Sequence, residues 1–164
     1  MGPVGHSAIS AGIGAGLWGI TGSPVAGGSA LAVGVLTDVD HLFDYNRWYA
    51  RRQKGRVYLL FHAWEYSIVG LLVLGLVYYH PLLLAVVLAH LGHVATDHFH
   101  NRLAPWGYFL TYRAFVRFNS AHIAPNHNVL YSYKSWPRLF PFGYLLLPWY
   151  QRHIEPWFQS RIND

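Results

Sequence analysis

The chain has 164 residues, of which 53% are hydrophobic, 17% aromatic and only 12% charged, and its net charge is +5. Soluble domains carry roughly 25% charged residues, so this composition favours a protein that contacts lipid. The sequence contains no cysteine, which excludes disulfides, thiolate zinc sites and cysteine nucleophiles.

Two apolar stretches open the chain. They cover residues 7–20 and 25–36, and the turn residues TGSP (21–24) lie between them. Pro24 suits the first position of a helix, so we expect two helices joined by a tight turn. Small residues let membrane helices approach closely, and the alternative is a Gly-rich hairpin buried in a soluble protein. The glycines expected to form this packing surface are Gly12, Gly14, Gly16, Gly27 and Gly28.

The next segment, YNRWYARRQKGR (45–56), is basic and is expected to be a polar loop. A long apolar run follows, with no formal charge between Glu65 and Asp97. Pro81 divides this run into two predicted helices of about 17 residues, or about 26 Å each. This length approaches the hydrocarbon core of a bilayer, which is about 30 Å thick.

After Asn101 the sequence becomes amphipathic and rich in Trp, Tyr, Pro and Arg, a mixture typical of a membrane–water interface. The predicted fold is therefore all-α and integral to a membrane. A short up-and-down four-helix bundle occupies residues 1–101. A C-terminal interfacial helical and aromatic extension, residues 102–164, packs on it.

An up-and-down arrangement gathers most of the acids and histidines at one end of the bundle. These residues are His6, Asp38, Asp40, His41, His62, Glu65, His93 and Asp97. The basic loop lies at the same end, so the positive-inside rule places that end in the cytoplasm, facing inward from the inner (plasma) membrane. His90 lies one turn deeper and is expected to be a core histidine.

Imidazole and carboxylate groups without thiolates favour zinc, manganese, iron or nickel. Several carboxylates could hold one or two ions, which would activate water for hydrolysis. We expect Asp38 or Glu65 to accept the proton of that water. Guanidinium and ammonium groups of Arg47, Lys54 or Arg56 could bind a substrate phosphate.

The pattern resembles a known family. An N-terminal His, D-x-D-H at a helix end (DVDH, 38–41), a His before the third helix and H-x-x-x-D (93–97) are similar to the YdjM-type membrane-bound metal-dependent hydrolases. The resemblance covers roughly residues 1–101. It implies a divalent metal, most simply zinc, and the ligands it implies are His6, Asp38, Asp40, His41, His62, His93 and Asp97. Many members read H-R-G-x-T-H-S where this chain has FHAWEYS, so Glu65 is a ligand, a base or a residue that orients His62.

We therefore expect a membrane-bound hydrolase of phosphate-ester or lipid-linked substrates, in contact with membrane lipid. One alternative is a metal transporter or chaperone that uses the same residues, and another is a membrane scaffold without catalysis. No nucleic-acid partner is expected, and the sequence has no nucleotide-binding Gly-rich loop, G-x-S-x-G or H-E-x-x-H motif.

Overall fold

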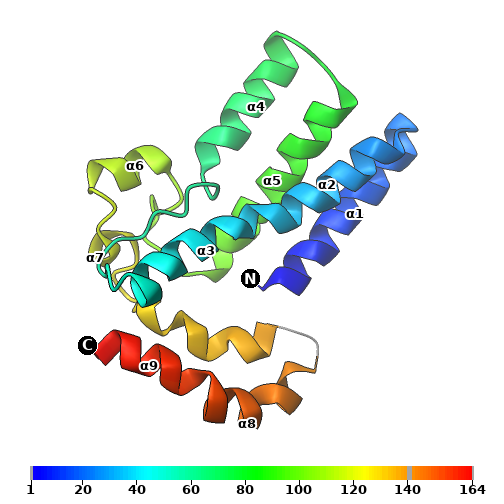
Figure 1. Cartoon of the computed structure of the whole chain (residues 1–164). Helices are drawn as coiled ribbons and strands as arrows, with labels where there is room; N and C mark the ends of the chain where they lie inside the picture. Colours follow the sequence, from blue (N-terminus) through cyan, green and yellow to red (C-terminus); the bar gives the residue numbers. More distant parts are fainter. Residues whose placement is uncertain (1, 140–141, 164) are drawn as a thin grey trace.

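The computed structural model describes residues 2–139 and 142–163 (Figure 1). The α-helices of these residues are α1 (Pro3–Thr21), α2 (Pro24–Leu36), α3 (Asp40–Tyr45), α4 (Trp64–Leu76), α5 (Pro81–His100), α6 (Leu110–Phe115), α7 (Ser120–Ile123), α8 (Gly143–His153) and α9 (Glu155–Asn163). Two 3₁₀ helices, η1 (Thr37–Val39) and η3 (Val129–Leu139), and a π-helix, η2 (Asn46–Ala50), complete the set. No strand occurs in the described part of the chain, so the all-α prediction is confirmed.

Two helical hairpins form the upper part of the molecule. The turn between α1 and α2 places Gly22 at φ 69°, and the Ser23 hydroxyl accepts a hydrogen bond from the Ala26 N–H at the start of α2. The His80 side chain caps α5 in the same way, at 3.2 Å from the Leu82 N–H. Both turns lie where the sequence predicts them, because each combines a capping side chain with a proline at the first helical position.

Helix α5 is the central element of this part, since it packs against α1, α2 and α4 (Figure 1). Alanines fill much of its interface with the first hairpin, and the core cluster there is Leu17, Ala26, Ala30, Ala85 and Ala89. Such small side chains let the helices lie close together. Helix α4 packs mainly on α5, so the four helices form two hairpins joined along α5.

Close contact between α1 and α2 depends on two of the five glycines singled out above. A Cβ atom on Gly14 would lie 2.5 Å from the Gly27 carbonyl oxygen, so neither position has room for a side chain. Gly12, Gly16 and Gly28 would meet nothing within 4 Å, and their predicted packing role is wrong. All three are exposed on the outer faces of the hairpin: Gly12 and Gly16 lie about half a turn from Gly14, and Gly28 lies about a quarter turn from Gly27.

Of the described helices, only α5 is long and apolar enough to cross a membrane, and α4 is apolar but has 13 residues. Core helices of soluble proteins can share these properties. Length and composition of the helices therefore do not decide between a membrane-spanning bundle and a buried core.

The basic segment is not simply a loop. The chain continues from α2 through η1, α3 and η2 as one helical path to Ala50, where the Arg51 N–H donates to the Asn46 carbonyl at 2.9 Å. Trp48 and Tyr49 are 3% and 1% exposed. Burial of these two rings favours helix here over the polar loop that the charges suggested.

A second core lies beneath the bundle, where residues 48–59 meet the C-terminal region. Its buried members are Trp48, Tyr49, Val57, Leu59, Ile123, Tyr133 and Phe158. Helices α8 and α9 form the lower edge of the molecule (Figure 1). The C-terminal region thus packs on the segment that links α3 to α4.

Candidate metal centre

Six acid and histidine side chains converge where α1, η1, α3 and α5 meet the segment before α4. They form two sets of potential ligands whose donor atoms all lie within 4.8 Å of one another in each set. The first set is His6, Asp38, His93 and Asp97, and the second is Asp38, His41, His62 and Asp97. Both sets contain the same two carboxylates, Asp38 and Asp97. These groups could hold metal, and the sharing of two carboxylates is suited to a pair of ions.

The site is closed on most sides. His6, His62, His93 and Asp97 are each at most 1% exposed. Asp38 and His41 differ, with side chains 20% and 28% exposed. Solvent therefore reaches the cluster along the edge formed by η1 and α3.

Asp38 lies at the centre of the cluster and contacts three of its histidines. Its Oδ1 atom lies 3.3 Å from His62 Nε2, 3.4 Å from His93 Nε2 and 3.5 Å from His41 Nε2. One carboxylate oxygen thus faces three imidazole nitrogens from three different segments.

Asp97 faces the other half of the cluster. Its Oδ1 lies 3.0 Å from His6 Nε2, and its Oδ2 lies 3.4 Å from His62 Nε2 and 3.8 Å from His93 Nε2. The His6 and His93 rings stack with centroids 3.7 Å apart. His6 Nδ1 is buried and has no hydrogen-bond partner among the described residues, while His6 Nε2 faces the Asp97 carboxylate. A cation held between Nε2 and that carboxylate would bind both.

The imidazole orientations also fit a cation. His62 Nδ1 contacts Asp40 Oδ2 at 3.0 Å, and His93 Nδ1 contacts the Gly34 carbonyl at 2.8 Å. An acceptor at Nδ1 keeps the proton there, which leaves Nε2 with a lone pair. The two Nε2 atoms face each other at 3.0 Å. Two lone pairs at this distance repel, so the site needs a proton or a positive ion between the rings.

Asp40 and Asp44 fix the segment that presents His62. Asp40 Oδ2 accepts a hydrogen bond from the Phe61 N–H at 2.6 Å. Asp44 Oδ2 accepts from the N–H groups of Tyr58 and Leu59 at 2.9 and 3.1 Å. Asp40 was expected to be a ligand, but the structure places it behind His62, where it holds the ring in position.

The carboxylates and His62 stabilise each other's charged forms. Burial alone would raise the Asp38 pKa, but hydrogen bonds from His41, His62 and His93 hold this pKa well below its usual range. Burial would likewise lower the His62 pKa, yet the surrounding carboxylates raise it well above the ordinary value. Without metal, the cluster therefore retains a proton that a divalent cation would displace.

The other predicted site residues lie elsewhere. Glu65 accepts hydrogen bonds from the Leu110 and Thr111 N–H groups at 3.0 and 2.8 Å, so its carboxylate anchors the start of α6. The Arg47 guanidinium lies 4.8 Å from the centre of the Tyr58 ring.

The two remaining basic residues of the predicted phosphate site also lie outside the cluster. Lys54 Nζ donates to the Ile162 carbonyl at 2.5 Å. Arg56 lines a separate pocket, which is described below.

Sequence reasoning missed Arg113. Its side chain is fully buried, and all three guanidinium nitrogens lack a hydrogen-bond partner among residues 2–139 and 142–163. Burial lowers the Arg113 pKa, and the negative charges of Asp40 and Glu65 oppose that shift. Arg113 belongs to the stretch after Asn101 that was expected to lie at the membrane–water interface, and no sequence signal showed that it faces inward.

Comparisons of this chain with protein families, with curated proteins and with solved structures find no match.

Proposed function

We propose that this protein is a membrane-bound, metal-dependent hydrolase of phosphate-ester or lipid-linked substrates, as its resemblance to the YdjM-type family suggests. The observation that carries this proposal is the pair of ligand sets that share Asp38 and Asp97. Zinc, manganese or iron would suit these nitrogen and oxygen donors. Two such ions would polarise a phosphoryl oxygen and lower the pKa of water.

The side chains around the cluster have separate roles in this proposal. His6, His41, His62 and His93 supply neutral nitrogen donors, and Asp38 and Asp97 supply charge shared between both sets. Asp38 is also the carboxylate on the solvent-accessible edge, which makes it the base best placed to accept a proton from water. Glu65 is not assigned this role, because its oxygens bind the start of α6.

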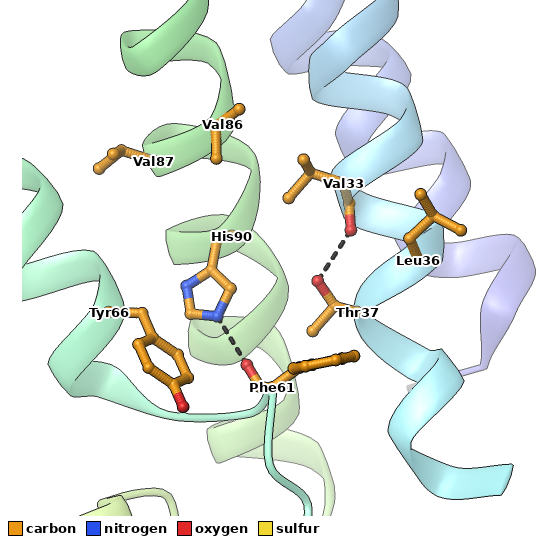
Figure 2. Close-up of a pocket in the computed structure, with 8 residues that line it drawn as sticks. All are labelled: Val33, Leu36, Thr37, Phe61, Tyr66, Val86, Val87 and His90. Carbon is orange, nitrogen blue, oxygen red and sulfur yellow. Dashed lines mark hydrogen bonds between the residues drawn. The ribbon is translucent and has the colours of Figure 1, made fainter.

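An apolar cleft of about 280 Å³ next to the cluster supports a lipid-linked substrate (Figure 2). It is lined by Val33, Leu36, Thr37, Phe61, Tyr66, Val86, Val87 and His90. Thr37 and Phe61 directly precede Asp38 and His62 in the chain, so one end of the cleft adjoins the metal centre.

Two of the polar side chains on the cleft wall, Thr37 and His90, are already paired. The Thr37 hydroxyl donates to the Val33 carbonyl at 2.8 Å, and His90 contacts the Phe61 carbonyl and the Ser67 hydroxyl, both at 2.7 Å. The cleft can therefore make dispersion contacts with an apolar chain, and it has few groups left to bind a polar ligand. A substrate with an acyl or isoprenoid chain here would present its head group near Asp38.

Surface composition supports the membrane setting. Helix α4 exposes Val69, Leu72 and Leu76 at 58%, 53% and 80%. The outer face of the first hairpin exposes Trp18 and Ile20 at 56% and 84%. Apolar patches of this kind mark contact with lipid or protein. The basic residues near η2 would place the metal end in the cytoplasm, on the inner face of the plasma membrane.

Orientation can be tested because the chain lacks cysteine. Gln53→Cys and Tyr79→Cys place single thiols at the two ends of the helical part. In intact cells, a membrane-impermeant maleimide should label Tyr79→Cys and leave Gln53→Cys unlabelled. Equal labelling of both thiols would contradict the proposed orientation.

Hydrolysis is tested with detergent-purified protein loaded with zinc, manganese or iron. The assay compares aryl phosphate mono- and diesters with short and long alkyl chains. Asp38→Asn should lower the rate by at least about 100-fold, whereas His127→Ala, a histidine substitution outside the cluster, should leave it unchanged. Val86→Trp should reduce turnover of long-chain substrates only, and Leu72→Trp on the exposed face of α4 is its matched control. Metal binding without turnover of any substrate would favour the transporter or chaperone alternative.

A further inference from the structure

A second cavity, with several basic side chains on its wall, lies away from the metal centre between the segment after η2 and the connection from α6 to α7. Its volume is about 450 Å³. The residues that line this basic pocket are Lys54, Gly55, Arg56, Phe115, Val116, Arg117, Asn119 and His122. It shares no residue with either ligand set.

Backbone contacts hold the two walls of the basic pocket together. The Val57 N–H donates to the Phe118 carbonyl at 2.9 Å, and the Ser120 N–H donates to the Gly55 carbonyl at 3.0 Å. Arg117 and Phe118 both have positive φ values, 55° and 59°, which non-glycine residues rarely adopt. Strained backbone of this kind is concentrated at functional sites.

The positive charges of the pocket have no acidic partner in the part of the chain that the structure describes. Lys54, Arg56 and Arg117 are cationic, His122 adds an imidazole, and none of the eight lining residues is an acid. The only contact that Lys54 Nζ makes with oxygen among the described residues is with a neutral carbonyl.

The acids of the described residues are occupied elsewhere. The aspartates lie in the metal cluster or bind the segment before His62, and Glu65 binds α6. Glu155 accepts a hydrogen bond from Gln159 within α9. Among the described residues, the three cations of this cavity therefore have no acidic counter-charge, and a bound anion would offset their mutual repulsion.

We propose that the basic pocket binds the phosphate of an anionic phospholipid head group. Guanidinium groups form paired hydrogen bonds with phosphate oxygens, and Arg56 and Arg117 approach the cavity from opposite walls. Phe115, on the wall of the cavity, is 84% exposed. An exposed aromatic ring beside cationic groups is typical of a surface that enters the membrane–water interface.

This proposal does not depend on hydrolysis at the metal centre. Lys54 and Arg56 were expected to hold the reacting phosphate, but the structure places both in the separate basic pocket. The pocket would instead hold a head group that does not react and would orient the protein on an anionic leaflet.

The test uses the full chain in a neutral detergent and measures binding by calorimetry. The probes are dihexanoyl phosphatidylglycerol, dihexanoyl phosphatidylcholine, glycerol 1-phosphate and inorganic phosphate. Wild type should bind phosphatidylglycerol saturably and bind phosphatidylcholine at least about 10-fold more weakly, because each basic residue near an anionic lipid contributes about fivefold in affinity.

Arg56→Gln/Arg117→Gln should weaken phosphatidylglycerol binding by about 25-fold at constant ionic strength. Arg138→Gln/Arg152→Gln removes the same charge from exposed positions on η3 and α8, and it should change the affinity by less than about threefold. Metal content and the circular dichroism spectrum confirm that each variant folds. If Arg117→Gln does not fold, Arg56→Gln/His122→Gln serves in its place.

Two results would overturn the proposal. If both double variants lose affinity equally, binding reflects net charge and not the pocket. If inorganic phosphate or glycerol 1-phosphate binds as tightly as phosphatidylglycerol, the ligand is a soluble phosphate compound and not a lipid head group.

Discussion

The sharing of Asp38 and Asp97 between the two ligand sets predicts how metal is lost from variants. His6 belongs to the first set only, and His41 to the second only. His6→Ala and His41→Ala should therefore each retain one ion. Asp38→Asn should lose both, because its Oδ1 faces imidazoles from both sets at 3.3 to 3.5 Å.

The magnitude follows from linkage. An ion at 100 times its Kd stabilises the folded chain by about 2.7 kcal/mol. For a chain of this length, each kcal/mol raises the Tm by about 2–4 °C, so each ion should add roughly 5–10 °C. Zinc should raise the Tm of the wild type by twice as much as that of His6→Ala, and it should barely change the Tm of Asp38→Asn.

The assay combines elemental analysis of the dialysed protein with thermal unfolding at several zinc concentrations. Asp40→Asn tests whether Asp40 binds metal itself or only orients the His62 ring. Asp40 contacts only Nδ1 of His62 within the cluster, so this variant should keep both ions with about 10- to 100-fold weaker affinity. A single ion in wild type, lost equally in His6→Ala and His41→Ala, would refute the two-ion reasoning.

Three further predictions concern protonation and packing. In the folded, metal-free state the His62 pKa lies above its unfolded value, so protonated His62 stabilises the fold fully below about pH 6.5, and this stabilisation is lost as pH rises through the folded pKa. Zinc affinity should rise over the same pH range, because zinc displaces the proton. Calorimetry of zinc binding in two buffers measures the protons released. Gly14→Ala should destabilise the fold by about 1–3 kcal/mol in thermal melts, because its methyl group would collide with the Gly27 carbonyl. Gly12→Ala should stabilise the fold by about 0.5–1 kcal/mol, because the helix gains alanine where there is space. Equal effects of the two substitutions would contradict the close contact of α1 with α2. Arg113→Met should leave the free energy of unfolding unchanged or raise it by about 1 kcal/mol, because it removes a buried guanidinium that has no hydrogen-bond partner among the described residues. A loss above about 2 kcal/mol in denaturant titrations would show that Arg113 is paired.

The general placement of the cluster could be predicted because it depends only on where apolar runs begin and end. Turn residues and prolines mark both hairpins, and an up-and-down order then gathers His6, His62 and Asp97 at one end. These signals are local, and each involves a cap or a breaker with a strong conformational preference. The structure accordingly brings together every residue of the two ligand sets, all of which the sequence analysis named.

The remaining assignments could not be predicted, because they depend on contacts between distant segments. Glu65 reaches α6, which lies 45 residues further along the chain. Arg113 faces inward although it is charged, and Lys54 and Arg56 line one pocket together with Arg117. A charge pattern shows how many basic residues are present, but tertiary packing decides which of them share a cavity.

The acids of the segment LTDVDHLFD (36–44) have distinct roles because this segment continues α2 as helix. Asp38 and His41 are three residues apart and point into the cluster, whereas Asp40 and Asp44 are four apart and point toward residues 58–62. One helical path thus carries ligands on one face and, on the other, the carboxylates that hold His62 in place. If the helix ended at Asp38, His41 would not be held at this spacing and the segment before His62 would lose its anchors. Continuation of the helix to Ala50, driven by burial of Trp48 and Tyr49 in the second core, therefore couples the C-terminal region to the geometry of the metal centre.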